Sequence, residues 1–448
     1  MSASPDGDDA LIFAVGIEDT AIEVPLRLGG QRLDEYELTG HLQQWPEDLA
    51  RATATGASEI RYGLPWHRVN PAPGVFDWAW ADEVIGHLAN EAGLRVILDL
   101  VHYGTPAWLA NSFADPRYPA AVAEYARAVA SRYRGMIGAY TPLNEPLVTA
   151  SFCGLRGVWP PYLSGDHGWA TVVTAVAAGV QASVRAIRDA DPGAQIVHVE
   201  AVQAYQTADP SLAGELRMQE GRSELPTQLI LGQVGPDDPM WAWLIQHGVS
   251  ADVMRRLAAE AVSPDVIGLN YYPELSCREL VRLDGTVVHV ACDGGTGRLE
   301  QALRHWHARY DSPLMITETA VEGSDAKKRA WLDELVASLR RLRREDIDVR
   351  GLTWWPLVDF VDWGWASGGA VVEEFYRRDG ASGPPRPVEP MGEPGGPVTP
   401  FLRRMGIYSL HADGDGRLSR EPTGLLEHFR SHADGTSAAG SHTDQGTR

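Results

Sequence analysis

The sequence contains little cysteine and almost no lysine. Its three cysteines, Cys153, Cys277 and Cys292, are scattered through 448 residues. So few distant thiols cannot build a disulfide framework or a zinc site, so we expect reduced thiols that mostly pack and no bound metal. Lys327 and Lys328 are the only lysines, and arginine supplies the other basic side chains.

Long apolar runs and positive charge are also scarce. No apolar run approaches the ~20 residues that span a bilayer, and the first ten residues, MSASPDGDDA, lack the basic start and apolar core of a secretion signal. Because 60 acidic residues outnumber 39 basic ones, the formal net charge is −21. Such a surface repels phosphate backbones and anionic membranes. We expect a cytoplasmic protein with no nucleic-acid or membrane partner.

Short apolar runs alternate with longer amphipathic stretches. The run LRVILDLV at 94–101 is typical of a strand buried on both faces, whereas 331–345 repeats leucine and valine at helical spacing. The candidate strands are 11–17, 59–64, 94–101, 137–143, 195–200, 266–270, 314–317 and 351–355. Eight strands alternating with helices predict an α/β fold, a single (β/α)8 TIM barrel at 11–430 with loop insertions at its C-terminal face.

Three segments differ from this pattern. Residues 1–10 are expected to be an N-terminal tail, and 431–448 a disordered C-terminal tail. The insertion 366–400 is rich in proline and glycine, and its part 376–400 is predicted to hold no regular element. Because it follows the eighth strand, a lid over the barrel mouth and a solvated loop are both open interpretations.

Two glutamates occupy strand ends, where barrels carry their reactive groups. The fourth predicted strand runs into Glu145, and the seventh ends at Glu318. Cleavage of a glycosidic bond needs one protonated carboxyl for the leaving oxygen and one ionised carboxylate that attacks the anomeric carbon or activates water. Two nearby carboxyls help to set that difference, because ionising one disfavours ionising the other.

Six segments resemble, in order, motifs of glycoside hydrolase family 1, the β-glucosidases and their relatives. The family patterns are Y-R-F-S-x-x-W-x-R-x-x-P, T-x-N-E-P, G-x-N-Y-Y, I-T-E-N-G, W-S-L-x-D-N-F-E-W and R-F-G-L-Y-x-V. The matching segments here are IRYGLPWHRVNP (60–71), YTPLNEP (140–146), GLNYY (268–272), MITET (315–319), WWPLVDFVDW (354–363) and RRMGIYSL (403–410).

This resemblance implies a retaining β-glycosidase that needs no cofactor. It makes Glu145 the acid/base and Glu318 the nucleophile of a double displacement. It pairs Arg61 with the nucleophilic carboxylate and gives Asn270 and Tyr272 a supporting role.

The resemblance also implies contacts to the sugar. Asn144 would bind the 2-hydroxyl, and His102 would contact another hydroxyl of the glycon, the sugar on the non-reducing side of the bond. Trp355 would be the platform under the sugar ring, and Trp363 would touch the glycon edge. The alternative for such residues is a hydrogen-bonded network at the barrel mouth with no ligand.

Three positions depart from the family pattern. Counting along 13–23 from Gly16 puts Glu23 where the family has a sugar-binding glutamine. The family's H-W becomes His102-Tyr103, and a glutamate that holds distal hydroxyls is shortened to Asp362. Two carboxylates around the glycon favour a cationic or otherwise modified sugar, such as an aminosugar, over plain glucose.

Two further functions stay open. A transglycosidase would use a sugar or alcohol acceptor in place of water, and a carbohydrate-binding barrel would keep the cleft with little or no turnover. In every case the expected partner is a carbohydrate or a glycosylated small molecule. The sequence identifies neither the aglycone nor the oligomeric state.

Overall fold

Eight parallel strands close into a barrel, which confirms the predicted (β/α)8 architecture. This computed structural model describes residues 11–24, 27, 29–367, 375–378, 383–388, 392–414 and 416–435. Neighbouring strands follow the order β1-β13-β12-β9-β7-β6-β5-β4. Each overlaps one predicted segment: β1 (Ile12–Gly16), β4 (Glu59–Gly63), β5 (Arg95–Asp99), β6 (Ala139–Thr141), β7 (Gln195–Ala201), β9 (Val266–Asn270), β12 (Leu314–Thr319) and β13 (Val349–Trp354).

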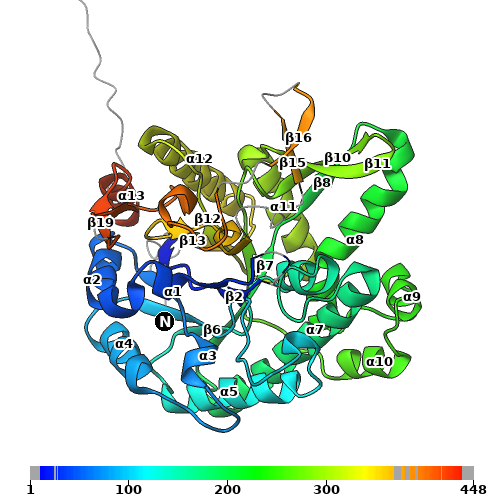
Figure 1. The fold of residues 1–448 in the computed structure, drawn as a ribbon, viewed down its shortest axis with the longest axis horizontal. Coiled ribbons are helices and arrows are strands. Elements are labelled where there is room, and N and C mark those ends of the chain that lie inside the picture. The colour runs from blue at the N-terminus through cyan, green and yellow to red at the C-terminus, as the bar shows by residue number, and fades with distance from the viewer. Residues whose placement is uncertain are drawn as a thin grey trace, which may run out of the picture.

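Helices surround the barrel (Figure 1). The longer ones are α2 (His41–Ala54), α4 (Ala79–Asn90), α5 (Tyr118–Arg132), α7 (Gly165–Ala190), α8 (Ala213–Ile230), α11 (Gly295–Tyr310) and α12 (Asp325–Arg343). The shorter ones are α1 (Glu35–Leu38), α3 (Trp66–Val69), α6 (Pro146–Ala150), α9 (Pro239–Gln246), α10 (Ala251–Ala259) and α13 (Leu426–Ala433). A π turn at Ser151–Leu155 continues α6.

Burial on both faces explains the continuous apolar strands. In β5, Ile97 packs inside the barrel with Ala14 and Val199, whereas Val96 and Leu98 pack outward in the large cluster shared with the helices. Because side chains alternate along a strand, both sets must be apolar. Helix α12 instead buries one leucine-rich stripe and leaves most of its arginines at the surface, as the helical spacing predicts.

A second sheet lies beside α8 at the side of the barrel (Figure 1). Its order is β16-β15-β11-β10-β8, from β8 (Ala204–Gln206), β10 (Cys277–Leu283), β11 (Thr286–Cys292), β15 (Phe375–Arg378) and β16 (Pro385–Pro387). The prediction of no regular element in 376–400 is therefore wrong, because β15 pairs with β11 and β16 with β15. Edge strands tolerate proline, and β16 is an edge strand. Residues 368–374, 379–382 and 389–391 lie outside the described residues, so the lid hypothesis stays a prediction.

Three two-stranded ribbons complete the described structure. They pair β2 (Ala21–Glu23) with β3 (Arg32–Asp34), β14 (Phe360–Val361) with β17 (Leu402–Arg403), and β18 (Tyr408–Ala412) with β19 (Leu418–Pro422). The first two carry chain that follows β1 and β13, at the end of the barrel where the glutamates lie.

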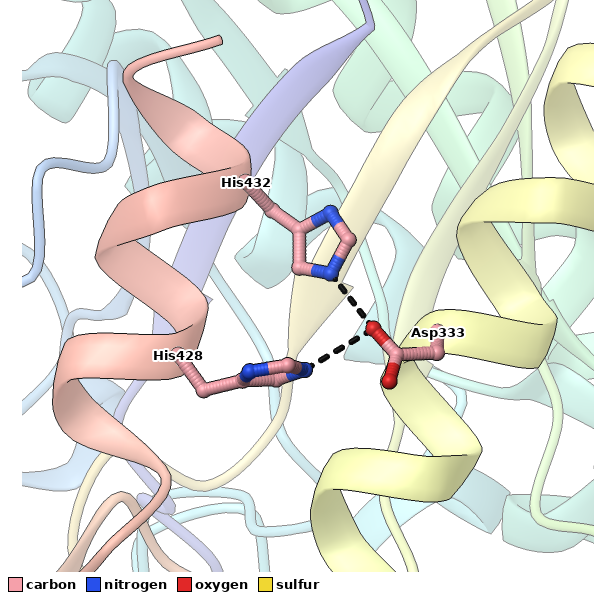
Figure 2. A group of neighbouring side chains, drawn as sticks. All are labelled: Asp333, His428 and His432. Carbon is pink, nitrogen blue, oxygen red and sulfur yellow. Dashed lines mark hydrogen bonds and ion pairs between the residues drawn. The ribbon is translucent and has the colours of Figure 1, made fainter. Parts of the chain in front are cut away.

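The final helix, α13, is fastened to α12 by a shared carboxylate. His428 and His432 both contact Oδ1 of Asp333, at 2.8 and 2.7 Å (Figure 2). The ring of His432 also stacks on Phe13 of β1, with centroids 6.3 Å apart. The predicted start of the C-terminal tail at 431 is thus too early, because α13 continues to Ala433. Residues 1–10 and 436–448 lie outside the described residues.

Helix α7 is the one described helix that is long and apolar enough to cross a membrane. In this fold 72% of its most apolar window is buried, and it packs on α5 and α8. The core of the barrel therefore accounts for its composition.

Candidate active site

Glu145 and Glu318 line one cavity of about 230 Å³ at the mouth of the barrel. Glu145 follows β6, and Glu318 lies on β12, so the carboxyl ends of two parallel strands bring them to the same edge. Glu145 has a left-handed backbone (φ 45°) at the start of α6. Its N–H donates to the carbonyl of Val199 at 3.2 Å, which fixes this unusual conformation.

A cation and a phenol hold the Glu318 carboxylate. Nη1 of Arg61 donates to Oε1 at 2.6 Å, and the Tyr272 hydroxyl donates to Oε2 at 2.8 Å. Arg61 is fully buried and also donates to Asp99 and Asn144. These contacts favour the ionised form of Glu318.

Neutral donors hold the Glu145 carboxyl. Nδ2 of Asn270 donates to Oε1 at 2.9 Å, and the Tyr103 hydroxyl donates to Oε2. Thr317 orients Asn270, because its hydroxyl donates to the amide oxygen at 2.7 Å. Glu145 has no hydrogen-bonded cation among the described residues, in contrast to Glu318.

Burial gives both carboxyls a higher pKa than that of an exposed glutamate. It raises the pKa of Glu145, and it raises the pKa of Glu318 to about 7, a rise that Arg61 opposes and the charge of Glu145 increases. Because each charge disfavours the other, the pair retains one proton near neutral pH. Among these two carboxyls, Arg61 hydrogen-bonds only to Glu318, which favours the negative charge on that side chain.

Three predicted contact residues form a layer beneath the cavity. Asn144 is fully buried and bonds to Tyr103, Arg61 and Asn270. His102 contacts Asp99 and Asp19 through Nδ1 at 3.2 and 3.1 Å. Burial lowers its pKa, but Asp19, Asp99 and Glu18 raise it to about 10, so the ring is a cation.

Trp355 also belongs to this layer, which differs from its predicted place under a sugar ring. Its side chain is 1% exposed and stacks on His102, with centroids 5.5 Å apart. The Arg61 guanidinium lies 4.9 Å from the ring centroid. The indole N–H donates to Glu18 at 3.0 Å. Because cationic groups pack against the ring, Trp355, like Asn144 and His102, is not among the residues that line the cavity.

Counting from Gly16 leads to the wrong glutamate. Glu23 is exposed on β2 and does not line the cavity, whereas Glu18 does. Glu18 lies two residues beyond β1, and the chain then turns outward into the β2–β3 ribbon. Attention to the end of the first strand, in place of counted spacing, would have found it.

Asp362 and Trp363 line the cavity as expected, but both carboxylate oxygens of Asp362 already accept hydrogen bonds from the protein. Its Oδ2 accepts from Arg403 at 2.9 Å, and its Oδ1 accepts from the N–H of Gly364 at 2.7 Å. Arg403 bonds to Glu322 as well. The buried indole N–H of Trp363 meets no acceptor within the described part of the chain.

The sequence interpretation missed the other side of the cavity. There α6, the π turn with the residue after it, α7, α8 and the second sheet supply apolar and basic side chains: Leu147, Val148, Phe152, Leu155, Arg156, Trp169, Tyr205, Arg222, Arg278 and His289. No local motif marks them, because five separate elements bring them together.

Among the described residues, two groups of side chains have the composition of a metal site. The first group consists of Asp19, Asp99 and His102, whose ligand atoms lie within 4.8 Å of one another. The positive charges of Arg61 and His102 already neutralise its two carboxylates. Asp333, His428 and His432 form the second group, at the α12–α13 contact and outside the cavity lining (Figure 2). There each imidazole already bonds to the carboxylate. Neither group supplies an open coordination position beside the glutamates.

Sequence comparison links one segment to β-galactosidases. The family model of glycoside hydrolase family 42, described as β-galactosidase, matches residues 37–135. A β-galactosidase from Thermus thermophilus is 38% identical over 74 residues, 16% of this chain and 11% of that protein. A galactolipid galactosyltransferase from Arabidopsis thaliana is 22% identical over 343 residues, 72% of this chain and 51% of that protein. The chain thus spans about a tenth to a half of the length of these relatives.

Structural comparison covers nearly the whole chain. A β-glucosidase from Thermotoga maritima in complex with deoxynojirimycin aligns with a TM-score of 0.74 and 16% identity, over 97% of this chain and 99% of that chain. A family 1 β-glucosidase from the same organism, in complex with isofagomine lactam, aligns with the same score over 96% and 98%. The sequence match is to family 42 and the structural likeness is to a family 1 enzyme. The chain is therefore a TIM barrel with the fold of a β-glucosidase, and its residues 37–135 are similar to β-galactosidases.

Proposed function

We propose that this protein is a retaining β-glycosidase, with Glu318 as nucleophile and Glu145 as acid/base. The observation that carries the proposal is the unequal support of the two carboxyls in one cavity. Glu318 receives a hydrogen bond from the Arg61 cation, whereas Glu145 receives only neutral donors. This difference matches the requirement for one ionised and one protonated carboxyl.

The reaction proceeds in two displacements. The Glu318 carboxylate attacks the anomeric carbon while the bond to the aglycone oxygen breaks, and that oxygen takes the proton of Glu145. In the second step Glu145 accepts a proton from water, the water oxygen attacks the anomeric carbon, and the ester bond to Glu318 breaks. The phenol of Tyr272 and the guanidinium of Arg61 hold the nucleophile throughout.

The proposed glycon is glucose or galactose in β-linkage, as in the names of the relatives. The argument for an aminosugar loses its basis, because Glu23 is exposed and Asp362 is paired with Arg403. Glu18 still offers a carboxylate at the cavity. A comparison of kcat/KM on neutral and amino nitrophenyl β-glycosides therefore decides the glycon.

Turnover of aryl β-glycosides by wild type and Glu318→Gly tests the assignment. We expect the variant to lose activity by roughly a thousandfold or more, and azide to restore turnover as an α-glycosyl azide. Glu145→Ala with azide should give the β-glycosyl azide. NMR of the first wild-type product should show the β-anomer. A Glu318→Gly variant as active as wild type contradicts the nucleophile, and a protein inactive on every glycoside supports a binding barrel.

Transglycosylation is the second candidate. It is favoured by the relative named galactolipid galactosyltransferase, which matches 72% of this chain. The chemistry differs only in the second displacement, where an alcohol or sugar hydroxyl replaces water. Product analysis with excess glycerol or sugar acceptor separates the two, because a transglycosidase yields mainly the new glycoside.

A further inference from the structure

Two histidines of α13 lie on one side of that helix. His428 and His432 are four residues apart, a spacing that makes side chains neighbours on a helix. Their ring centroids are 5.1 Å apart. Figure 2 shows both rings directed from α13 toward α12, each with Nε2 at the same oxygen of Asp333. One helix thus supplies two imidazole nitrogens, and the other supplies a carboxylate.

The three side chains are close enough to hold one ion. Oδ1 of Asp333 lies 2.8 Å from Nε2 of His428 and 2.7 Å from Nε2 of His432, and one ligand atom of each residue lies within 4.8 Å of the other two. Tetrahedral Zn²⁺, with bonds of about 2.0–2.2 Å to nitrogen and oxygen, sets neighbouring ligand atoms about 3.4 Å apart. The carboxylate must therefore withdraw by roughly 0.6 Å. The Asp333 side chain is 52% exposed, so it has room to rotate.

No fixed cation competes for the Asp333 carboxylate. Within the described residues, its hydrogen-bonded and ionic partners are the two imidazoles. A neutral imidazole offers its Nε2 lone pair when its proton moves to Nδ1. In His432 this move breaks no hydrogen bond at Nδ1, because that atom has no partner in the described part of the chain. The other group of metal-type residues differs, because its Asp99 bonds to the buried guanidinium of Arg61.

The ligand types select a class of ion. Imidazole nitrogens suit Zn²⁺, Ni²⁺ and Cu²⁺, whereas Mg²⁺ and Ca²⁺ prefer sets of oxygen ligands. Zn²⁺ is satisfied by four ligands and has no redox chemistry. Three side chains leave a fourth position for water, which can reach the site because Asp333 and His428 are both partly exposed.

An ion at this place would link distant parts of the chain. Asp333 lies on α12, and the histidines lie on α13, the last described helix. The rings of His432 and Phe429 pack on Phe13 of β1, with centroids 6.3 and 5.7 Å away. The three ligands come together only in the folded chain, so the binding free energy of the ion adds to the stability of the fold.

We propose that Asp333, His428 and His432 bind one Zn²⁺ ion, with water as the fourth ligand, and that the ion fastens α13 to α12. Three metal–ligand bonds then replace the two hydrogen bonds between the imidazoles and the carboxylate. The site lies outside the lining of the cavity that holds the two glutamates. The inference is therefore independent of the proposed glycosidase function.

The test uses the full chain without a polyhistidine tag, freed of metal with EDTA. Calorimetric titration should show one Zn²⁺ bound per chain and no comparable binding of Mg²⁺. Thermal unfolding should show a Tm higher by about 3 °C when free Zn²⁺ exceeds its Kd a hundredfold, because the ion binds the folded site. Mg²⁺ at the same concentration should leave the Tm unchanged.

His428→Gln separates metal binding from the hydrogen bond. The glutamine amide can still donate to Asp333, so the metal-free Tm should stay near that of wild type, but the amide is a poor ligand for Zn²⁺. The Kd for Zn²⁺ should rise about a hundredfold or more, since loss of even an outer partner of a ligand costs about 10–100-fold. Asp333→Asn, which removes the anionic ligand, should raise the Kd about tenfold or more.

The matched control is His305→Gln. His305 on α11 is exposed and contacts Glu224 at 2.6 Å, but it belongs to neither three-residue group of the described chain. A single imidazole beside a carboxylate lacks the second nitrogen ligand, so this variant should keep the wild-type affinity for Zn²⁺.

The outcomes decide the inference clearly. One bound Zn²⁺ that raises the Tm, with weaker binding in His428→Gln and Asp333→Asn and unchanged binding in His305→Gln, supports the site. A wild-type chain that binds no Zn²⁺, or a His428→Gln variant that binds it equally well, overturns the site. Binding that leaves the Tm unchanged overturns the fastening of α13. None of these results alters the glycosidase proposal, which Glu318→Gly tests separately.

Discussion

At the scale of single residues, Arg61 decides which glutamate carries the charge. Its guanidinium is fully buried and divides its hydrogen bonds among Glu318, Asp99 and Asn144. The nearby acids raise its pKa against the effect of burial, so it stays charged at every accessible pH. A buried charge with such partners is costly to remove, because its partners remain behind uncompensated.

We predict that Arg61→Gln moves the acid limb of the kcat/KM profile to higher pH by about one unit or more. Loss of the cation further raises the pKa of Glu318, which burial and Glu145 already hold near 7. The nucleophile is then ionised only at higher pH. Arg61→Lys keeps the charge and should leave the limb nearly in place while lowering kcat. An unmoved limb in Arg61→Gln would show that Arg61 only supports the fold.

The candidate site residues could be predicted where they lie at the end of a barrel strand. Glu145 and Glu318 follow from the carboxyl ends of β6 and β12. Glu18 was missed because the chain after β1 leaves the barrel, so spacing counted from Gly16 led to Glu23 on an exposed ribbon. The opposite side of the cavity could not be predicted, since Arg156, Arg222 and Arg278 meet there only through tertiary packing.

At the scale of elements, Glu200 connects β7 to the start of α6. Its Oε1 accepts from the N–H of Leu147 at 3.2 Å and from that of Ala201 at 2.9 Å. Leu147 is two residues beyond Glu145, so Glu200 supports the turn that presents the acid/base. Burial raises the pKa of Glu200 well above its usual value, which favours the neutral carboxyl.

We predict that Glu200→Ala lowers kcat by roughly tenfold with little change in KM, because α6 shifts relative to the bound glycoside. Glu200→Gln keeps an acceptor oxygen of the same reach and should restore most of kcat. Steady-state kinetics on an aryl β-glycoside gives both numbers. Equal losses in the two variants, or a change confined to KM, would rule out this positioning role.

A second element-scale prediction concerns the contact between α12 and α13. Asp333→Asn should lower the free energy of unfolding by about 1 kcal/mol, because two hydrogen bonds lose their charged acceptor on a half-exposed side chain. Thermal unfolding of the variant should show a lower Tm with unchanged kcat, since the cluster is not part of the cavity lining. The matched control is Asp252→Asn, whose carboxylate pairs with Arg255 on exposed α10. A fall in Tm no larger than that of the control would contradict the link.

The sequence predicted those helices and strands whose own residues carry the pattern, and it missed those that depend on contacts with distant segments. The barrel strands have continuous apolar runs, because each is buried between the interior and the helices. Strand β15 depends on pairing with β11, about 90 residues earlier in the chain, and β16 depends on pairing with β15. The two strands are short and carry no alternating pattern. The C-terminal tail was predicted to start too early, at 431, because the packing of His432 on Phe13, which is distant in sequence, leaves no local pattern.

At the scale of the whole molecule, buried carboxyls make stability depend on pH. Burial raises the pKa of Asp19, Glu35 and Glu200 well above the usual range, and that of Glu318 to about 7. Such groups hold protons in the folded chain that they release in the unfolded chain. Since stability falls with pH wherever the folded state binds more protons, these groups destabilise the fold as pH rises above their unfolded pKa of about 4.5.

Two buried histidines act in the opposite direction at lower pH. Burial lowers the pKa of His198 and of His289 to about 4, so the folded state binds fewer protons there than the unfolded chain. Their effect makes stability rise with pH up to the unfolded histidine pKa of about 6.5 and ends above it. Between about pH 6.5 and 9 the histidines His198 and His289 no longer contribute, and the carboxyls act together with His102, whose raised pKa of about 10 also makes stability fall with pH.

We predict that the Tm falls across that interval and that Glu35→Gln reduces the fall. Glu35 is fully buried, and its Oε2 accepts from the N–H of Val361 at 3.1 Å, a bond that the glutamine oxygen can keep. Its charge is not needed, so the amide should make the protein more stable than wild type at pH 8, with the difference shrinking toward pH 5. Calorimetric unfolding at constant ionic strength measures both curves. A wild-type Tm that rises from pH 6.5 to 9 would mean that Glu35 and its buried neighbours ionise without cost, and the protonated state assigned to Glu145 would then lose its physical basis.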